Sequence, residues 1–130
     1  MLLPSGLRAA LLQAAAAALP NEACGLLGGT GAELSAFIPC RNVLESPTRY
    51  AIAPEEVLVA LKRLRAADLE LRAIFHSHPL GPARPSATDI REAAYPGVLH
   101  LIVGFLPEPE LRGFSIEGDE VSEETLVPTP

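Results

Sequence analysis

Two histidines stand two positions apart in the segment HSHPLGPARPSATDI, residues 76–90. Side chains at positions i and i+2 of a strand point to the same face, so His76 and His78 would face the same way. Seven residues separate His78 from Ser86, and Asp89 follows three positions later. A catalytic zinc has three protein ligands and one open position. The segment therefore predicts a metal site formed by His76, His78 and Asp89.

The same residues also have a purely structural interpretation. Ser86 and Asp89 form an S-x-x-D pattern, a variant of the capping box that begins a helix. On this interpretation they bond only to backbone groups, and the histidines are polar residues where a strand ends. The two interpretations are compatible. The chain has only three histidines, and two of them lie beside the box, which favours a site.

A metal hydrolase also needs a base that takes a proton from the attacking water. The chain has no H-E-x-x-H helix, so the base must come from elsewhere. Glu22 stands at the head of the apolar run EACGLLGG, which is typical of a buried strand. A carboxylate there is costly unless it has a partner or a function. The alternative is that Glu22 lies just outside the strand, in solvent.

Three other residues carry reactive or ligating side chains. Cys24 would share the strand face of Glu22, and we expect it to be a small buried core residue. Cys40 is expected to be incidental, and a disulfide between the two cysteines is possible but not expected. His100 lies in the apolar run VLHLIVGF, where a core or sheet-end histidine is expected rather than a fourth ligand.

The surrounding pattern predicts the elements that would position these residues. We expect a helix capped by Ser5, a hairpin, a loop with a short strand over 50–53, further helices over 54–67 and 86–94, and strands between and after them. Residues 127–130 are expected to be frayed. This order predicts one α/β domain over residues 1–130, a single mixed β-sheet flanked by helices.

Composition excludes some classes of function. The 130 residues are 48% hydrophobic and 20% charged, as in an ordinary globular domain. The formal net charge of −6 argues against nucleic acid as a partner, because binding it requires a basic surface. The apolar N-terminal stretch is too short to span a bilayer and has no charged region of a signal peptide before it. We therefore expect a cytoplasmic protein without a membrane partner.

The motif His76-Ser77-His78, seven residues, Ser86, two residues, Asp89 resembles that of the JAMM (MPN+) metalloprotease family, also called Mov34/MPN/PAD-1. Glu22, within N-E-A-C-G-L-L-G-G, completes the family signature. The similarity covers most of the chain, including the H-L-I-V strand after the motif. The chain looks most like the short prokaryotic JAMM proteins, which consist of the JAB domain.

This resemblance implies the MPN/JAB fold, related in layout to cytidine deaminases, and a zinc-dependent peptidase or isopeptidase. His76, His78 and Asp89 would ligate one zinc ion per chain. Glu22 would take the proton from the attacking water, and Ser86 would bind the oxyanion. The implied substrate is a ubiquitin-like or sulfur-carrier protein, cut after its C-terminal tail. A sulfur carrier ending in Gly-Gly is the partner that we expect in a bacterium.

Other classes remain open. A non-catalytic MPN-type scaffold would lack ligands, and none is missing here. A relative of the DNA-repair-associated RadC group would share the H-x-H-P and P-S-x-x-D stretches, but it differs around its first motif. A zinc deaminase would need a C-x-x-C pair, which this chain does not have. Tyr50 and Ile52 in the loop 41–53 are weaker candidates, for pairing with a substrate tail as an added strand.

Overall fold

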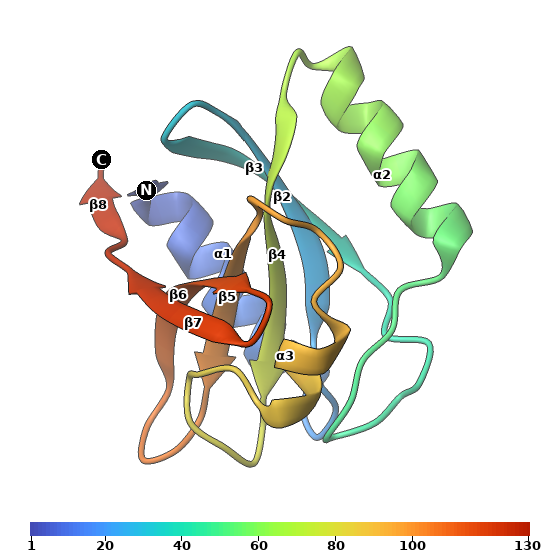
Figure 1. The fold of residues 1–130 in the computed structure, drawn as a ribbon, viewed down its shortest axis with the longest axis vertical. Coiled ribbons are helices and arrows are strands. Elements are labelled where there is room, and N and C mark those ends of the chain that lie inside the picture. The colour runs from blue at the N-terminus through green and yellow to red at the C-terminus, as the bar shows by residue number, and fades with distance from the viewer.

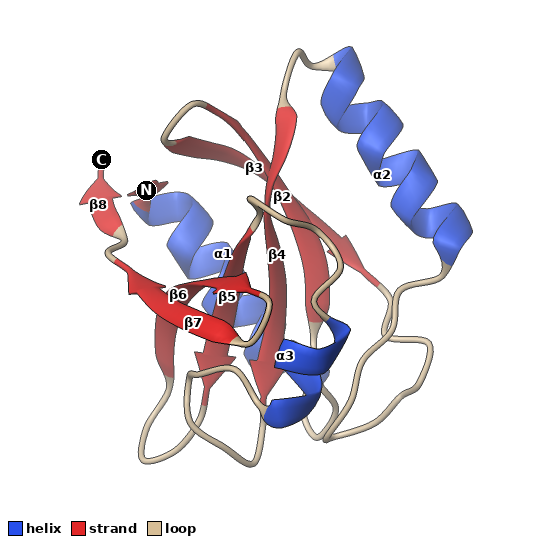
Figure 2. Ribbon diagram, viewed as in Figure 1, coloured by secondary structure: helices blue, strands red, loops and turns tan.

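One curled sheet forms the centre of the protein, with a helix packed on each face and a short third helix at one end (Figure 1). The computed structural model describes all residues from 1 to 130. The sheet has eight strands in the order β7-β6-β5-β4-β2-β3-β1-β8. It is mixed, because β4 runs parallel to β5 while β2 runs antiparallel to both of its neighbours. The predicted fold class, a mixed sheet flanked by helices, is confirmed (Figure 2).

The strands vary from three to nine residues in length. They are β1 (Leu2–Pro4), β2 (Cys24–Thr30), β3 (Glu33–Cys40), β4 (Glu70–His78), β5 (Leu99–Gly104), β6 (Glu110–Glu117), β7 (Glu120–Glu124) and β8 (Val127–Thr129). The predicted hairpin of β2 and β3 forms, and Gly31 makes its turn at a φ of 60°, where a side chain would be strained. β5 is an interior strand, as its continuous apolar run predicts.

Helices α1 (Ser5–Ala18) and α2 (Pro54–Ala66) cover opposite faces of the sheet. The alanine-rich α1 inserts Leu11 and Ala15 into the larger core cluster. α2 begins at Pro54, has two glutamates in its first turn, and packs Leu64 against the other face. The third helix, α3 (Ala87–Glu92), has no buried residue. No helix is both long and apolar enough to cross a membrane.

Three local expectations were wrong. Residues 50–53 form no strand, and the backbone of Ala51 bonds within the loop instead: its N–H donates to Asn42 Oδ1 and its carbonyl accepts from Val43 N–H. Ser5 does not cap α1, since the N-cap position is Pro4, which ends β1. The C-terminal tail is not frayed, because β8 pairs with the open edge of β1 and Val127 N–H donates to Met1 O at 2.9 Å.

Candidate metal centre

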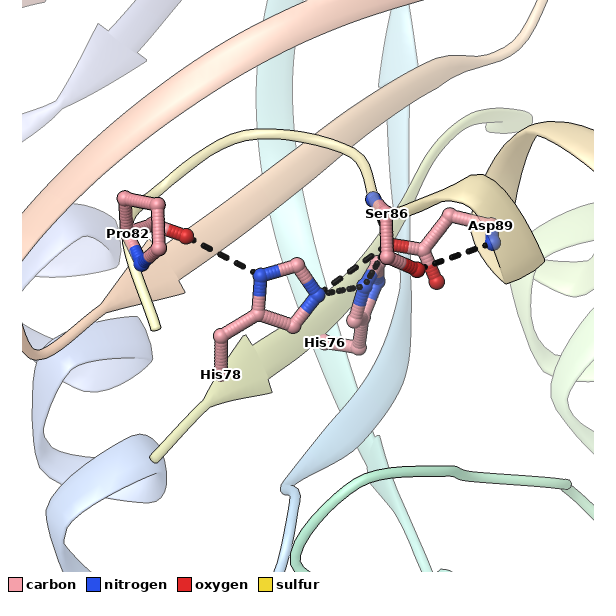
Figure 3. Close-up of polar contacts among 5 residues, drawn as sticks. All are labelled: His76, His78, Pro82, Ser86 and Asp89. Carbon is pink, nitrogen blue, oxygen red and sulfur yellow. Dashed lines mark hydrogen bonds and ion pairs between the residues drawn. The ribbon is translucent and has the colours of Figure 1, made fainter. Parts of the chain in front are cut away.

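Three of the predicted site residues converge at the C-terminal end of β4 (Figure 3). His76 Nε2 lies 3.0 Å from His78 Nε2, and Asp89 Oδ2 lies 3.0 Å and 3.1 Å from these two nitrogens. The two histidines alternate with Ser77 on β4, so both rings lie on the same face. The three groups therefore form one compact triangle of possible ligand atoms.

The proline-rich loop between β4 and α3 returns the chain to the histidines. α3 begins with the predicted capping box: Ser86 Oγ accepts a bond from Asp89 N–H at 3.0 Å, and Asp89 Oδ2 accepts one from Ser86 N–H at 2.9 Å. The box fixes the Asp89 carboxylate in the first helical turn, facing the histidines. Capping and metal-ligand geometry are thus present in the same residues.

One hydrogen bond from outside the triangle orients His78. His78 Nδ1 lies 3.0 Å from Pro82 O, which can only accept, so this nitrogen carries a proton. In a neutral His78 the Nε2 then holds a lone pair that faces Asp89 Oδ2 and His76 Nε2. His76 Nδ1 has no hydrogen-bond partner, so a proton on His76 Nε2 or a cation among the three atoms would offset the repulsion between these lone pairs.

Burial and the hydrogen bonds of the triangle shift the pKa values of all three groups. Burial would lower the pKa of His78, but its bonds to Asp89 and to the Pro82 carbonyl raise that pKa overall. Burial dominates at His76 and lowers its pKa, which favours the neutral ring. Burial opposes ionisation of Asp89, but hydrogen bonds from both imidazoles hold the pKa of this carboxyl well below its ordinary value.

The donor set fits zinc. Ligand atoms in a tetrahedral zinc site lie about 2.0–2.2 Å from the metal, and hence roughly 3.3 Å from one another. The separations of 3.0–3.1 Å in the triangle are within a few tenths of this value. Two imidazoles and one carboxylate form a ligand set typical of catalytic zinc, with the fourth position open. The Pro82 carbonyl orients His78 as outer partners do in such sites.

Glu22 lies beside the triangle, two residues before β2 begins at Cys24. Cys24 pairs with His76, and Ala23 and Ser77 bond to each other: Ser77 N–H donates to Ala23 O at 3.1 Å and Ala23 N–H donates to Ser77 Oγ at 2.7 Å. Continued by one residue, this register places Glu22 opposite His78. Glu22 is only 5% exposed, so the solvent-exposed alternative for this residue is wrong.

The environment of Glu22 suits a group that carries a proton near neutral pH. Burial raises its pKa from 4.5 to about 7, against the opposing effect of a positive His78 and with a smaller contribution from Asp89. Its carboxylate makes no hydrogen bond within the protein. Together with His78 and Ser86 it lines a groove of about 350 Å³. The side chains predicted as base and as oxyanion donor therefore face the same space as one of the ligands.

Sequence comparison identifies the family of this chain. A family model described as prokaryotic homologs of the JAB domain matches residues 4–117. The chain belongs to this prokaryotic JAB family. The predicted resemblance to the JAMM proteins is thereby confirmed.

Similar proteins of this family come from both bacteria and archaea. A Thermus thermophilus protein named as a probable TtuB-protein conjugate cleaving protease is 44% identical over 79% of this chain and 68% of its own length. A desampylase of Haloferax volcanii is 34% identical over 80% of this chain and 76% of its length. A CysO-cysteine peptidase of Mycobacterium tuberculosis is 35% identical over 82% of this chain and 76% of its length.

Solved structures share the fold. A protein from Desulfitobacterium hafniense superposes with a TM-score of 0.88 at 36% identity, covering 99% of this chain and 93% of its own. A JAB1/MPN domain protein from Archaeoglobus fulgidus gives 0.67 at 21% identity, covering 100% and 97%. The chain therefore has the JAB1/MPN fold.

The remaining candidate residues of this JAB-family chain do not join the ligand group. Cys24 and Cys40 are free and lie directly opposite each other on β2 and β3. Burial raises the pKa of the Cys24 thiol, so it stays protonated and is a poor metal ligand. His100 is 5% exposed and lines a cavity of about 200 Å³ beside His76. It lies outside the group of possible ligands, as expected.

Two positioning contacts were not predicted from the sequence. Tyr50 stacks on His76 with the ring centroids 4.7 Å apart and the planes inclined by 21°. This contact orients a ring whose buried Nδ1 has no hydrogen-bond partner. Ser77, between the two candidate ligand histidines, is fully buried and joins β4 to the residue after Glu22. A serine enclosed in an apolar strand needs a hydrogen-bond partner. This requirement is the one sequence signal that indicated the bond.

Proposed function

We propose that this chain is a zinc-dependent peptidase that hydrolyses the bond after the C-terminal tail of a ubiquitin-like or sulfur-carrier protein. The convergence of Glu22 and Ser86 on the groove beside the His76, His78 and Asp89 triangle carries this proposal. Relatives that are 44% and 35% identical are named for cleaving a TtuB-protein conjugate and a CysO-cysteine. Both names describe cleavage of a conjugate or adduct. Residues 1–130 would act as one catalytic domain.

In this proposal the triangle holds one zinc ion per chain. Bound there, zinc would lower the pKa of a water molecule toward neutrality and polarise the scissile carbonyl. His76 and His78 contribute neutral imidazoles, and Asp89 contributes the negative charge. The capping box and the Pro82 carbonyl hold two of these ligands in place before the substrate arrives.

Glu22 acts as the general base and then as the general acid. It takes a proton from the attacking water and delivers it to the leaving amine. In the zinc-free protein burial raises its pKa to about 7, which favours a group that can both accept and return a proton. No charged partner or hydrogen bond competes for the proton-accepting oxygens.

Ser86 stabilises the oxyanion of the tetrahedral intermediate. Its Oγ already accepts a bond from Asp89 N–H, so the hydroxyl proton remains free to be donated. The capping bond therefore also fixes Oγ at the groove that Ser86 lines. A donor fixed before the reaction stabilises developing charge without reorganisation.

The deciding experiment measures zinc content and cleavage together. Wild type, Glu22→Gln and the exposed control Glu70→Gln are purified without chelator and assayed for bound zinc. Each is incubated with sulfur-carrier proteins that extend beyond a Gly-Gly tail, and products are identified by mass spectrometry. We expect one zinc per chain in all three proteins and cleavage after Gly-Gly in wild type and Glu70→Gln. The Glu22→Gln variant should be at least about 100-fold slower, because general-base catalysis contributes that much.

The alternatives predict different results. Well-folded wild type without zinc would overturn the mechanism and favour a non-catalytic scaffold. Zinc in all three proteins without cleavage of any carrier would contradict the proposed substrate class. Equal cleavage by wild type and Glu22→Gln would show that another residue is the base.

A further inference from the structure

The segment between β3 and α2 contains no regular structure, yet it is closely bonded to the rest of the protein. We call residues 42–51 the clamp loop. Val43 N–H donates to Ala51 O at 3.0 Å, so the two ends of the clamp loop are joined. Glu45 N–H donates to Asn42 O at 3.1 Å and closes a turn inside it. Its shape is thus set by hydrogen bonds rather than by pairing with the sheet.

Asn42 is the centre of these bonds. It is 9% exposed, and its side-chain amide uses its full capacity. Nδ2 donates to Glu22 O at 3.2 Å and to Arg49 O at 3.0 Å. Oδ1 accepts from Leu44 N–H at 3.1 Å and from Ala51 N–H at 3.2 Å. One buried side chain therefore joins both arms of the clamp loop to the backbone of Glu22.

The backbone of Glu22 is held entirely by the clamp loop. Its N–H donates to Ser46 O at 2.9 Å, and its carbonyl accepts from Asn42. The ladder of β2 begins only at Cys24, so the sheet does not fix the backbone of Glu22 directly. The place of the carboxylate beside His78 consequently depends on the clamp loop keeping its shape, in addition to the bonds between Ala23 and Ser77.

The clamp loop also contacts the metal centre from the other side. Tyr50 stacks on His76, one residue after the Arg49 carbonyl that Asn42 binds. The clamp loop thus touches Glu22 through its backbone bonds and a ligand through an aromatic ring. A change in its shape would alter the distance between the two.

We propose that Asn42 is a positioning residue for the reaction, which holds Glu22 at its working distance from the metal centre. This role rests on the proposed function, in which Glu22 is the base. Asn42 itself does not touch substrate or metal. It acts by fixing the backbone on either side of the groove, so its loss should slow the chemical step and leave the ligands in place.

Two variants separate this role from a general effect on folding. Asn42→Asp has the same shape and keeps the acceptor for Leu44 and Ala51, but it places an oxygen against the Glu22 and Arg49 carbonyls. Asn42→Ala removes all four bonds without adding charge. The matched control is Glu56→Ala, because the Glu56 carboxylate accepts from Arg41 N–H at 3.1 Å and anchors the same segment without contacting Glu22.

The measurements are zinc content, kcat and KM on an extended sulfur-carrier protein, and hydrogen exchange at the Glu22 amide, all well below the melting temperature. In both Asn42 variants we expect kcat to fall at least tenfold, KM to change less than threefold, and zinc to remain stoichiometric. The Glu22 amide should exchange at least tenfold faster. Glu56→Ala should keep kcat within twofold even if its melting temperature falls.

Each other outcome overturns the role of Asn42. Unchanged kcat with faster amide exchange would show that the clamp loop does not control the base. Loss of zinc along with activity would mean that Asn42 supports the ligands instead. A decrease in kcat in Asn42→Asp alone would be an effect of the added charge. If wild type cleaves no carrier protein, the proposed function fails, and this role fails with it.

Discussion

The buried position of Glu22 is unfavourable for an ionised carboxylate. The residue is 5% exposed, its carboxylate makes no hydrogen bond within the protein, and burial raises its pKa to about 7. A group placed for stability alone would have a partner or would be apolar. Buried, perturbed carboxylates of this kind are common where proteins do chemistry. The free-energy cost of burying the ionised carboxylate should be measurable as a dependence of stability on pH.

Folding raises the pKa of Glu22, so between pH 4.5 and about 7 the native state binds more protons than the unfolded chain. The free energy of unfolding therefore falls as the pH rises through this window, and the full cost is present above pH 7. Replacing Glu22 by Gln removes that cost. In the zinc-free protein at pH 8 we expect Glu22→Gln to raise the free energy of unfolding by roughly 1–3 kcal/mol, with little difference near pH 4.5.

Urea denaturation of zinc-free protein at several pH values measures this difference. Glu70→Gln, at an exposed position of β4, is the control and should match wild type throughout. Zinc must be absent, because a nearby cation would itself favour the ionised carboxylate. A Glu22→Gln variant that is less stable than wild type at pH 8 would show that the carboxylate has a stabilising partner.

The residue types that carry chemistry could be predicted from the sequence, whereas the residues that position them could not. His76, His78 and Asp89 are residue types that ligate metals, and their spacing lets a strand and a capped helix bring them together. Asn42 has no such signal, because its bonds join two segments whose approach depends on the whole sheet. The contact of Tyr50 with His76 depends in the same way on how the clamp loop closes.

At the scale of elements, the metal centre depends on how closely β5 approaches the proline-rich loop. Gly104 ends β5 opposite His78, and an added methyl group there would overlap the backbone of Pro82 and Ala83. Pro82 O is the acceptor that orients His78. The absence of a side chain at Gly104 therefore lets this loop reach the ligand.

Gly104→Ala should displace the loop and weaken zinc binding without altering any ligand. We expect zinc affinity to fall about 10–100-fold, as when an outer partner of a ligand is lost, and the free energy of unfolding to fall by roughly 1–3 kcal/mol. Competition with a zinc chelator and urea denaturation measure the two effects. Gly81→Ala in the same loop is the control, because its methyl group would meet only His78 Cβ at an ordinary 3.8 Å. Equal zinc affinity in wild type and Gly104→Ala would show that the loop adapts.

Elements with strong periodicity were predicted close to their bounds, whereas the shortest were missed. α2 was expected over 54–67 and occupies Pro54–Ala66, because a proline followed by two glutamates indicates the first turn of a helix. β1 and β8 have three residues each and no pattern of their own. They are strands because each offers the other an unpaired edge, a condition that only the assembled sheet supplies.

At the scale of the whole molecule, the candidate metal centre lies apart from a region that stabilises the fold. The metal centre is at the C-terminal end of β4 near α3, and both termini lie on the side of the molecule away from α3 (Figure 1). The match to the family model ends at residue 117, so β7 and β8 lie beyond it. Leu126, between these strands, packs against the larger core cluster, close to Gly113. The tail therefore contributes to the fold on a side remote from the site.

Deleting residues 126–130 should lower stability and leave the metal centre unchanged. The deletion removes the apolar contact of Leu126 and exposes the edge of β1, so we expect the free energy of unfolding to fall by roughly 2 kcal/mol. Zinc affinity should stay within twofold of wild type, because no ligand or supporting residue lies in the tail. Leu126→Ala separates packing from strand pairing, since it keeps β8. If zinc affinity fell with the deletion but not with Leu126→Ala, the pairing of β1 and β8 would be coupled through the sheet to the metal centre, and the separation of the two regions would be wrong.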